Sequence, residues 1–358
     1  MKSKNIFIHS AYNSFNLEAK RGLKSPESFG LDLFFTFREI FKKIKETNNL
    51  IISQDPFPEM PENSILIYID LPRIETKKES FIRYLNKNNK SNNKIKLWLF
   101  EPHSIRANQY QFIENYHYMF SSIFTWSEDI LKKFDNSKIL FCPIINLERN
   151  KKNYSTLENT IKKELLTKEI SISFIGSNKS SLYPLNGYHF RIYILASLFK
   201  LTNKIFIYGN GWNQAHILPF RPNIFKRLIE FLMPKINKLG IVMGLSKDKS
   251  KSIKSHHYSL CIENEIGSKG YITEKIFDVL KELRLPIVFK TDELFPDEFK
   301  EYIIEISKFS SIDLLVKYLS ELYKSGEYFN KISSLNSLIE KSQLQEKIIN
   351  SSVEAIIK

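Results

Sequence analysis

A short stretch in the second half of the chain, residues 258–277, brings several chemically useful residue types together. An apolar run that predicts a buried strand leads into a Glu-Asn pair, a glycine-containing loop and a helical pattern. Thr273 is a suitable N-cap for that helix, whose first turn exposes unpaired backbone N–H groups. Those groups and the helix dipole favour an anion, Lys275 adds a full positive charge, and Glu274 can accept hydrogen bonds from sugar hydroxyls. The alternative is that Glu274 only complements the dipole and that Lys275 is a solvated helix residue.

A second cation lies near the start of another predicted helix. The segment Tyr188-His189-Phe190-Arg191 opens a helical pattern that continues to Lys200. An arginine in a first helical turn opposes the dipole unless an anion lies nearby. Arg191 and Lys275 therefore predict a small site for a phosphate-bearing ligand. The alternative for Arg191 is a surface position in which its aliphatic stem covers apolar neighbours.

A carboxylate suited to base chemistry follows an apolar run in the first half of the chain. Glu101 comes directly after Trp98-Leu99-Phe100, where a strand is expected to end. A carboxylate at such a strand end, facing a cleft, can take a proton from an attacking hydroxyl. The alternative is a solvated loop glutamate. His103 and Asp70 are weaker candidates for the same base.

Parallel sheets are expected to position these residues. The first 145 residues alternate short apolar runs with helical patterns, which is typical of a parallel sheet covered on both faces. The predicted strands are Asn5–His9, Leu50–Ile52, Ser64–Ile69, Ile95–Phe100, Ser122–Trp126 and Lys138–Pro143, with a helix over Leu31–Thr47.

A second α/β set follows a polar, lysine-rich stretch. Its predicted strands are Ile170–Ile175, Lys204–Tyr208, Tyr258–Ile262 and Pro286–Phe289; its predicted helices are Tyr188–Lys200, Pro222–Leu232, Thr273–Leu283 and Ile312–Lys324, before one or two helices over Lys331–Lys358. We expect an α/β protein of two Rossmann-like, doubly wound domains, residues 1–147 and 169–358, joined by a linker over 148–168. Ligands of such domains bind at the carboxyl ends of the strands, here in the cleft between the domains.

The composition narrows the class of protein. With 358 residues, 42% hydrophobic and 26% charged, the chain is expected to be globular, without a spanning helix or a signal peptide. Cys142 and Cys261 are expected to be buried free thiols, which suits a reducing cytoplasm. The net charge of +14 comes largely from lysine clusters such as Lys247–Lys251, for which we expect solvated loops. The alternative is contact with an anionic membrane surface, and no nucleic-acid motif accompanies the charge.

The signature Glu263-Asn264 … Tyr271-Ile272-Thr273-Glu274-Lys275 resembles that of the α-1,3/1,4-fucosyltransferase family. This family consists of inverting glycosyltransferases with a two-domain GT-B fold. Its pattern is an apolar strand that ends in Phe-Glu-Asn-Ser, a short loop, then Tyr-Val/Ile-Thr-Glu-Lys and a helix. The strand Leu285–Phe289, with its proline, falls where the family has a proline-containing strand. The segment Ser173–Asn178 resembles the strand-to-loop entry of the family's donor domain.

The resemblance implies a role for each candidate residue. Glu101 is the expected catalytic base, Arg191 and Lys275 stabilise the diphosphate, and Glu274 binds the ribose. Asn264 and Tyr271 position the donor. Further candidates are His103, Glu263, Ser177 and Gly209, the last in a glycine turn that either lets the backbone approach a ligand or is a plain tight turn. Trp126 is expected to be a core residue rather than a sugar platform.

By the same resemblance, the N-terminal domain binds the acceptor and the C-terminal domain binds the nucleotide sugar. The expected donor is GDP-fucose, and the expected acceptor is a hydroxyl of a bacterial surface glycan, such as lipopolysaccharide or an O-antigen intermediate. No Asp-x-Asp motif stands in a convincing strand-end context, and cationic side chains can replace a metal. We therefore expect no cofactor and no metal. The enzyme is expected in the cytoplasm, at most peripheral on the inner membrane. The lysine-containing tail is expected to pack back onto the first domain.

Three departures from the family pattern concern the donor sugar. The loop between Asn264 and Tyr271 is one residue longer than usual, Glu265 replaces the usual Ser, and Lys290-Thr291-Asp292 stands where the family has a glycine-containing segment. One alternative therefore keeps the fold and the mechanism but changes the nucleotide sugar. A distant alternative is a non-enzymatic binder of a polyanion or a membrane surface, whose affinity would depend strongly on salt.

Overall fold

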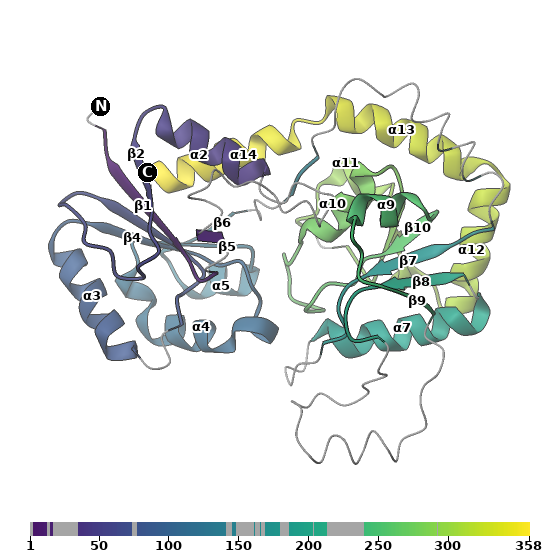
Figure 1. The fold of residues 1–358 in the computed structure, drawn as a ribbon, viewed down its shortest axis with the longest axis horizontal. Helices are drawn as coiled ribbons and strands as arrows, with labels where there is room; N and C mark the ends of the chain where they lie inside the picture. Colours follow the sequence, from purple (N-terminus) through teal and green to yellow (C-terminus); the bar gives the residue numbers. More distant parts are fainter. Residues whose placement is uncertain are drawn as a thin grey trace, which may run out of the picture.

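Two six-stranded parallel sheets, each with helices packed around it, form the described part of the protein (Figure 1). The computed structural model describes residues 3–12, 15–16, 35–73, 77–140, 145–147, 161, 165, 169–179, 186–202, 204–212, 240–291 and 293–358. The helix predicted over Pro222–Leu232, Cys142 and most of the predicted linker lie outside these residues. The predicted α/β class with two parallel-sheet domains is confirmed.

The first sheet contains all six strands that the apolar runs predict. They are β1 Asn5–Ser10, β2 Asn49–Ile52, β3 Ile65–Ile69, β4 Lys94–Trp98, β5 Ser122–Thr125 and β6 Ser137–Ile139, in the order β2-β1-β3-β4-β5-β6. The order reverses between β1 and β3, so the loops after these strands diverge and leave a crevice at their carboxyl ends. Asp70 directly follows β3, and Glu101 lies just beyond β4.

Helices cover both faces of this sheet because its strands are apolar on both sides. The helices of the first half are α2 Phe35–Lys45, α3 Lys78–Lys90, α4 His103–Tyr116 and α5 Glu128–Lys133, with a 3₁₀ turn η2 at His117–Met119. Alternate residues of β3 enter separate cores: Ile65 and Ile67 face α2, whereas Leu66 and Tyr68 face α3 and α4.

The second sheet has the strand order of a dinucleotide-binding fold. Its strands are β7 Ile172–Ile175, β8 Ile205–Tyr208, β9 Ile241–Gly244, β10 Tyr258–Leu260, β11 Leu285–Val288 and β12 Ile304–Glu305, in the order β12-β11-β10-β7-β8-β9. The sequence interpretation omitted β9, whose residues are mostly exposed, and β12, which has two residues. The order reverses between β7 and β10, which places the crevice beside the Glu-Asn pair that follows β10.

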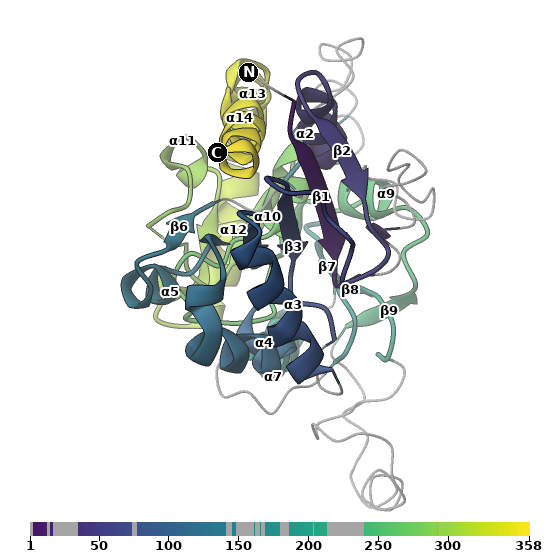
Figure 2. The same ribbon diagram turned by 90° about the vertical axis from the view of Figure 1, so that its left-hand side faces the viewer.

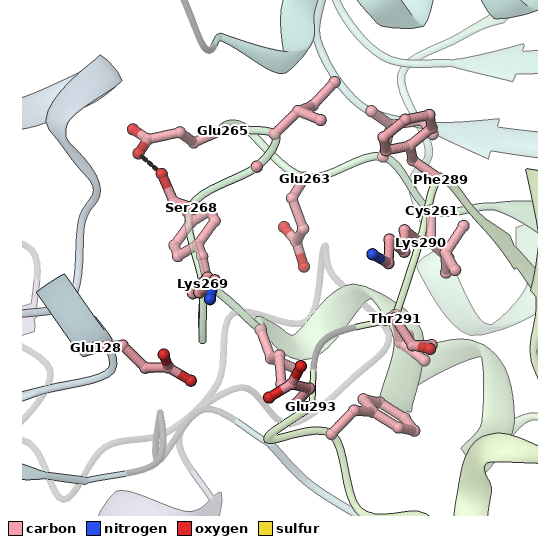
Figure 3. A pocket seen from close by; sticks show the side chains of 18 residues that line it. Glu128, Cys261, Glu263, Glu265, Ser268, Lys269, Phe289, Lys290, Thr291 and Glu293 are labelled. Carbon is pink, nitrogen blue, oxygen red and sulfur yellow. Dashed lines mark hydrogen bonds between the residues drawn. The ribbon is translucent and has the colours of Figure 1, made fainter. Parts of the chain in front are cut away.

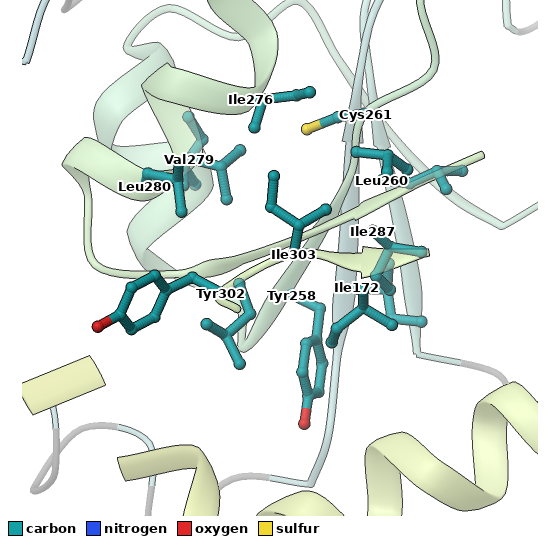
Figure 4. Packing of buried hydrophobic residues seen from close by; sticks show 14 of the residues in the cluster. Ile172, Tyr258, Leu260, Cys261, Ile276, Val279, Leu280, Ile287, Tyr302 and Ile303 are labelled. Carbon is teal, nitrogen blue, oxygen red and sulfur yellow. The ribbon is translucent and has the colours of Figure 1, made fainter. Parts of the chain in front are cut away.

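The helices of the second half are α7 Gly187–Leu201, α9 Lys249–Lys254, α10 Glu274–Lys281, α11 Asp297–Lys300, α12 Ile312–Lys324, α13 Glu327–Lys341 and α14 Leu344–Ile357, with a 3₁₀ turn η4 at Ile306–Lys308. One continuous core joins the sheet to these helices. Figure 4 shows part of it, with Ile276, Val279 and Leu280 of α10 near Leu260 and Cys261. Tyr258 crosses the same core and donates a 2.9 Å hydrogen bond from its hydroxyl to the carbonyl of Leu319. Cys261 is a buried free thiol, as predicted.

The last helix leaves the second domain and packs on the first. Helix α14 lies along α2 (Figures 1 and 2), and its Ile349 and Ile356 enter the core beneath α2. The buried Lys96 of β4 donates from Nζ to the carbonyls of Ala355 and Ile356, at 2.8 and 3.1 Å, and so caps the end of α14. The predicted return of the tail is confirmed, although the predicted domain 169–358 had kept these residues with the second sheet.

Among the helices that the structure describes, none is long and apolar enough to cross a membrane.

Candidate functional site

The Glu263 carboxylate organises the start of helix α10. It accepts hydrogen bonds from the backbone N–H of Thr273 at 3.0 Å, from the Thr273 hydroxyl at 2.7 Å and from Lys275 Nζ at 2.7 Å. Thr273 is the N-cap residue as predicted, but its side chain makes no capping bond inside the helix. The sequence interpretation of Thr273 as a conventional cap is therefore corrected: its hydroxyl is directed to Glu263.

Lys275 is held as a cation in the protein interior. Burial opposes its charge, but the carboxylates of Glu263 and Glu274 outweigh burial and raise the pKa of Lys275. Its side chain is only 21% exposed, so the alternative of a freely solvated helix residue is wrong. A buried ammonium at a helix start is suited to hold phosphate oxygens.

Arg191 is buried and braces the same turn from α7. Its Nε and Nη2 donate to the carbonyl of Ile262 at 3.1 and 2.8 Å, and Nη2 also donates to Asn264 Oδ1 at 2.8 Å. The guanidinium lies over the Tyr188 ring, 4.8 Å from its centroid. The alternative of a surface arginine is wrong, because Arg191 is 3% exposed. Burial lowers the pKa of Arg191, which remains far above neutrality in any protein.

Close backbone contact fixes α7 against the Glu-Asn turn. The N–H of Gly187 donates to the carbonyl of Asn264 at 2.8 Å. A Cβ at Gly187 would lie 2.0 Å from the carbonyl oxygen of Glu263, so only glycine fits there. Sequence reasoning missed Gly187, because only the three-dimensional contact gives it a role.

Asp70 gathers hydrogen-bond donors around the loop that carries Glu101. Its Oδ1 accepts from the N–H of Phe100 and from Gln109 Nε2, both at 2.9 Å, and its Oδ2 accepts from the Tyr12 hydroxyl at 3.0 Å. Asp70 is fully buried and has a left-handed φ of 52°. These contacts make Asp70 a residue that positions the loop. Sequence reasoning missed Tyr12 because it lies 58 residues from Asp70.

Glu101 has the protonation behaviour of a base that works near neutral pH. Burial, with the negative charges of Asp70 and Glu274, raises the pKa of Glu101 to about 7, against the opposing effects of Lys275 and Tyr12. Charges from both domains therefore act on this carboxyl. The alternative of a solvated loop glutamate is wrong. The Tyr110 hydroxyl donates to the backbone carbonyl of Glu101 at 2.8 Å and fixes the loop.

His103, the rival base, begins α4 and stacks on Tyr110. The two ring centroids are 3.5 Å apart, and burial lowers the pKa of His103.

The loop after Asn264 joins the two domains. Tyr271 is buried, and its ring centroid lies 4.7 Å from that of Trp126 in the first domain. The Trp126 indole N–H donates to the carbonyl of Phe100 at 3.1 Å, which confirms Trp126 as a packing residue. Tyr271, predicted to position a donor, thus contacts the first domain directly.

A cavity of about 280 Å³ opens beside Glu263. Figure 3 shows the Glu263 side chain in the middle of the cavity, with Ser268 and Lys269 on one side and Lys290 and Thr291 on the other. Glu128 of the first domain also lines it. Of the predicted site residues, Glu263 and Tyr271 line this cavity, whereas the others lie outside its lining: Glu101, His103, Ser177, Arg191, Gly209, Asn264, Glu274 and Lys275.

Gly209 and Ser177 lie at the ends of two neighbouring strands, β8 and β7. Gly209 has a φ of +139°, and a Cβ there would lie 2.2 Å from the carbonyl oxygen of Gly176 and 3.2 Å from the N of Ser177. The close approach that requires glycine is therefore to another backbone segment. Among the described residues, no group of His, Cys, Asp or Glu is arranged to hold a metal ion.

Residues 202–347 match the model of glycosyltransferase family 10 (fucosyltransferase), C-terminal part. This match covers less than half of the chain, and the architecture of the whole chain, two parallel-sheet domains, is that of GT-B glycosyltransferases. The match includes Asn264, Tyr271, Glu274 and Lys275, on which the predicted resemblance rested. No curated protein matches this chain.

Solved structures share the fold of this chain at low sequence identity. An α1,3-fucosyltransferase solved with GDP-fucose is 14% identical, with a TM-score of 0.54 over 100% of this chain and 92% of the other. HepE from Anabaena, solved with UDP-glucose, is 10% identical, with a TM-score of 0.53 over 98% and 99%. TarM from S. aureus, solved with UDP, is 14% identical, with a TM-score of 0.50; 90% of this chain is covered, and it spans 59% of TarM.

Proposed function

We propose that this protein is a glycosyltransferase that transfers fucose from GDP-fucose to a hydroxyl of a glycan acceptor, with inversion at the anomeric carbon. The observation that carries the proposal is that candidate catalytic residues from the two domains lie close to each other. Glu101 follows β4 of the first sheet, whereas Glu274 and Lys275 begin α10 of the second domain. The domains touch beside them, where Glu265 accepts a 2.9 Å hydrogen bond from the N–H of Ser104, and the charges of Glu274 and Lys275 act on the Glu101 carboxyl, whose pKa burial raises to about 7.

In this mechanism Glu101 takes the proton from the acceptor hydroxyl as its oxygen forms a bond to the anomeric carbon. The bond between that carbon and the phosphate oxygen breaks, and GDP leaves with the electron pair. Lys275 neutralises the charge that develops on the diphosphate, and Arg191 contributes a second positive charge beside it. Glu274 accepts hydrogen bonds from the ribose. Asn264, held by Arg191, and Tyr271, held by Trp126, keep the donor side of the cleft in place. No metal or cofactor takes part.

The acceptor we propose is a bacterial surface glycan or its lipid-linked precursor. An enzyme of this kind would work in the cytoplasm, and the net charge of +14 would favour peripheral contact with the anionic inner membrane.

A second candidate function is transfer of a different sugar by the same mechanism. Two of the departures from the family pattern, Glu265 and the pair Lys290-Thr291, line one cavity together with the longer loop. This cavity also holds the Glu263 carboxylate and the half-exposed Phe289 ring, which are groups suited to sugar hydroxyls and to an apolar sugar face. HepE, with a similar fold, was solved with UDP-glucose. The difference between the two candidates thus concerns the donor alone.

The nucleotide that stabilises the protein tests both candidates. The experiment measures melting temperature with GDP, UDP, CDP, ADP and CMP, with and without EDTA. A ligand at a hundred times its Kd adds about 2.7 kcal/mol of stability, which shifts the melting temperature visibly. We expect selective stabilisation by GDP that Lys275→Ala abolishes and EDTA leaves unchanged. A preference for UDP would favour the second candidate, and no response to any nucleotide would favour the polyanion binder.

A further inference from the structure

A largely buried lysine that the proposed mechanism does not use lies behind helix α10. Lys249 begins α9, and its Nζ binds Asp278 Oδ2 and lies 3.9 Å from Glu274 Oε1. Its side chain is 18% exposed, and that of Asp278 is 4% exposed. The prediction that Lys247–Lys251 forms a solvated cluster is therefore wrong for Lys249, although Lys251 is exposed.

The two carboxylates that Lys249 contacts repel each other. Glu274 and Asp278 are four residues apart on α10, so their side chains lie on the same face of the helix. In a buried setting, two such carboxylates cannot remain ionised together unless a cation compensates them. Lys249 binds Asp278, lies 3.9 Å from Glu274 and supplies part of that charge, next to the contribution of Lys275 to Glu274.

Other charges around this pair come from α10 itself and from the first domain. Lys275 and Lys281 act on it from α10, and Glu101 of the first domain lies within range of Glu274. Burial opposes the ionisation of Glu274, but Lys275 and Lys249 outweigh burial and lower the pKa of Glu274. Burial raises the pKa of Asp278, and Lys249 opposes that rise.

Further contacts hold α9 against α10, so the position of Lys249 is fixed. The Ser250 hydroxyl donates to Glu282 Oε1 at 2.8 Å, and Lys254 Nζ lies 2.9 Å from Glu282 Oε2. Asp248 caps α9 by accepting from the N–H of Lys251 at 2.9 Å.

We propose that Lys249 is a positioning residue for nucleotide binding: by contacting both carboxylates from behind, it keeps Glu274 ionised and in place to accept hydrogen bonds from the ribose. This inference rests on the proposed function, since it needs Glu274 to contact a ribonucleotide. It adds a residue that touches no substrate and lies outside the signature that carries the family resemblance.

The test compares GDP affinity between pH 6 and pH 8 for the wild type and for Lys249→Met. Without Lys249, the coupled pair takes up a proton at a higher pH, first on Asp278, whose pKa burial raises. Glu274 then shares this proton with Asp278 and accepts less well from the ribose as the pH falls. We expect the variant to bind GDP about tenfold more weakly than the wild type at pH 6, as for loss of a hydrogen bond to a charged group, with a smaller deficit at pH 8. The ratio of the GDP Kd of the variant to that of the wild type is taken at each pH. Effects that the two proteins share, such as the titration of GDP itself and of Glu101, cancel in this ratio.

Three further variants separate positioning from a general structural role. Lys251→Met, a matched change on the exposed face of α9, is expected to bind GDP as tightly as the wild type at every pH. Lys249→Arg keeps the charge and is expected to restore affinity. Asp278→Asn in the Lys249→Met background leaves one carboxylate alone, and its ratio is expected to be independent of pH. Lys249→Gln takes the place of Lys249→Met if the latter does not fold.

The outcomes distinguish this inference from the proposed function. If the wild type binds GDP and Lys249→Met has the same deficit at every pH, Lys249 is structural only and the inference fails. If the wild type prefers another ribonucleotide, GDP-fucose is excluded, and the same series measured with that nucleotide decides the role of Lys249. If no nucleotide binds, both proposals are overturned.

Discussion

The carboxylate of Glu265 accepts a 2.9 Å hydrogen bond from the backbone N–H of Ser104, a residue of the other domain. Ser104 lies in the first turn of α4, whose N-cap position is Pro102, so the helix has no capping side chain of its own. Glu265 supplies that acceptor from 161 residues away and also accepts from the Ser268 hydroxyl. The residue that departs from the family pattern therefore fastens the domains together beside the cleft.

Replacing Glu265 tests this contact between the domains. We expect Glu265→Ala to lower the free energy of unfolding by about 1 kcal/mol, because a helix start loses its acceptor. Glu265→Gln keeps an acceptor oxygen and is expected to lose less. Urea denaturation measures both variants. Equal stability of the alanine variant and the wild type would mean that the contact contributes nothing in solution.

Glu101→Gln removes the proposed base while keeping the size of the side chain. We expect the rate of transfer to fall by about 10²–10⁴-fold, the usual contribution of a general base, with GDP affinity retained. GDP release assays measure the rate, and the melting shift with GDP measures binding. A variant with near-normal turnover would exclude Glu101 as the base and would favour His103 instead.

The pH dependence of transfer follows from the raised pKa of Glu101. A base works when deprotonated, so kcat/KM is expected to rise with pH up to about 7 and to be level above it. Tyr12 opposes the rise in the pKa of Glu101, so Tyr12→Phe is expected to move the midpoint to higher pH. A profile between pH 5 and pH 9 measures both. A midpoint near 4.5 in the wild type would contradict a buried base.

Adding one methyl group at Gly187 is expected to disturb the donor side of the cleft. The new Cβ of Gly187→Ala would lie 2.0 Å from the carbonyl oxygen of Glu263, so α7 or the Glu-Asn turn must shift. We expect a loss of about 1–3 kcal/mol of stability, typical of overpacking, together with weaker GDP binding. Gly326→Ala, where a Cβ meets no atom within 4 Å but φ is +80°, adds backbone strain without steric contact and so separates the two effects. Unchanged GDP binding in Gly187→Ala would show that the turn tolerates movement.

Local sequence patterns predicted the sheets and the signature because both depend on neighbouring residues. Apolar runs and turn residues specify strands such as β10. Because Glu263-Asn264 lies just after β10 in the sequence, it lies at the carboxyl end of that strand in the structure. The helix over Ile312–Lys324 was predicted with the bounds that the structure has. In contrast, β9 was missed because it has only four residues and ends in a glycine, which gives a weak strand pattern.

The groups around the predicted residues could not be found in the same way. Asp70, Tyr12 and Glu101 come from three separate segments, and only the strand order brings them together. Lys249 belongs to a run of charges that resembles a solvated loop. Its burial depends on α10, which lies 29 residues further along the chain at Asp278.

The return of α14 to the first sheet has a consequence for the order of events during synthesis. Domains usually fold in the order in which the ribosome makes them. Here the core beneath α2 includes Ile349 and Ile356, which are made after all the strands of the second sheet. Until then, the first domain exposes apolar surface that its own residues cannot cover. The nascent first domain is therefore expected to depend on a chaperone or on rapid elongation, and its core is complete only when residue 356 has been added.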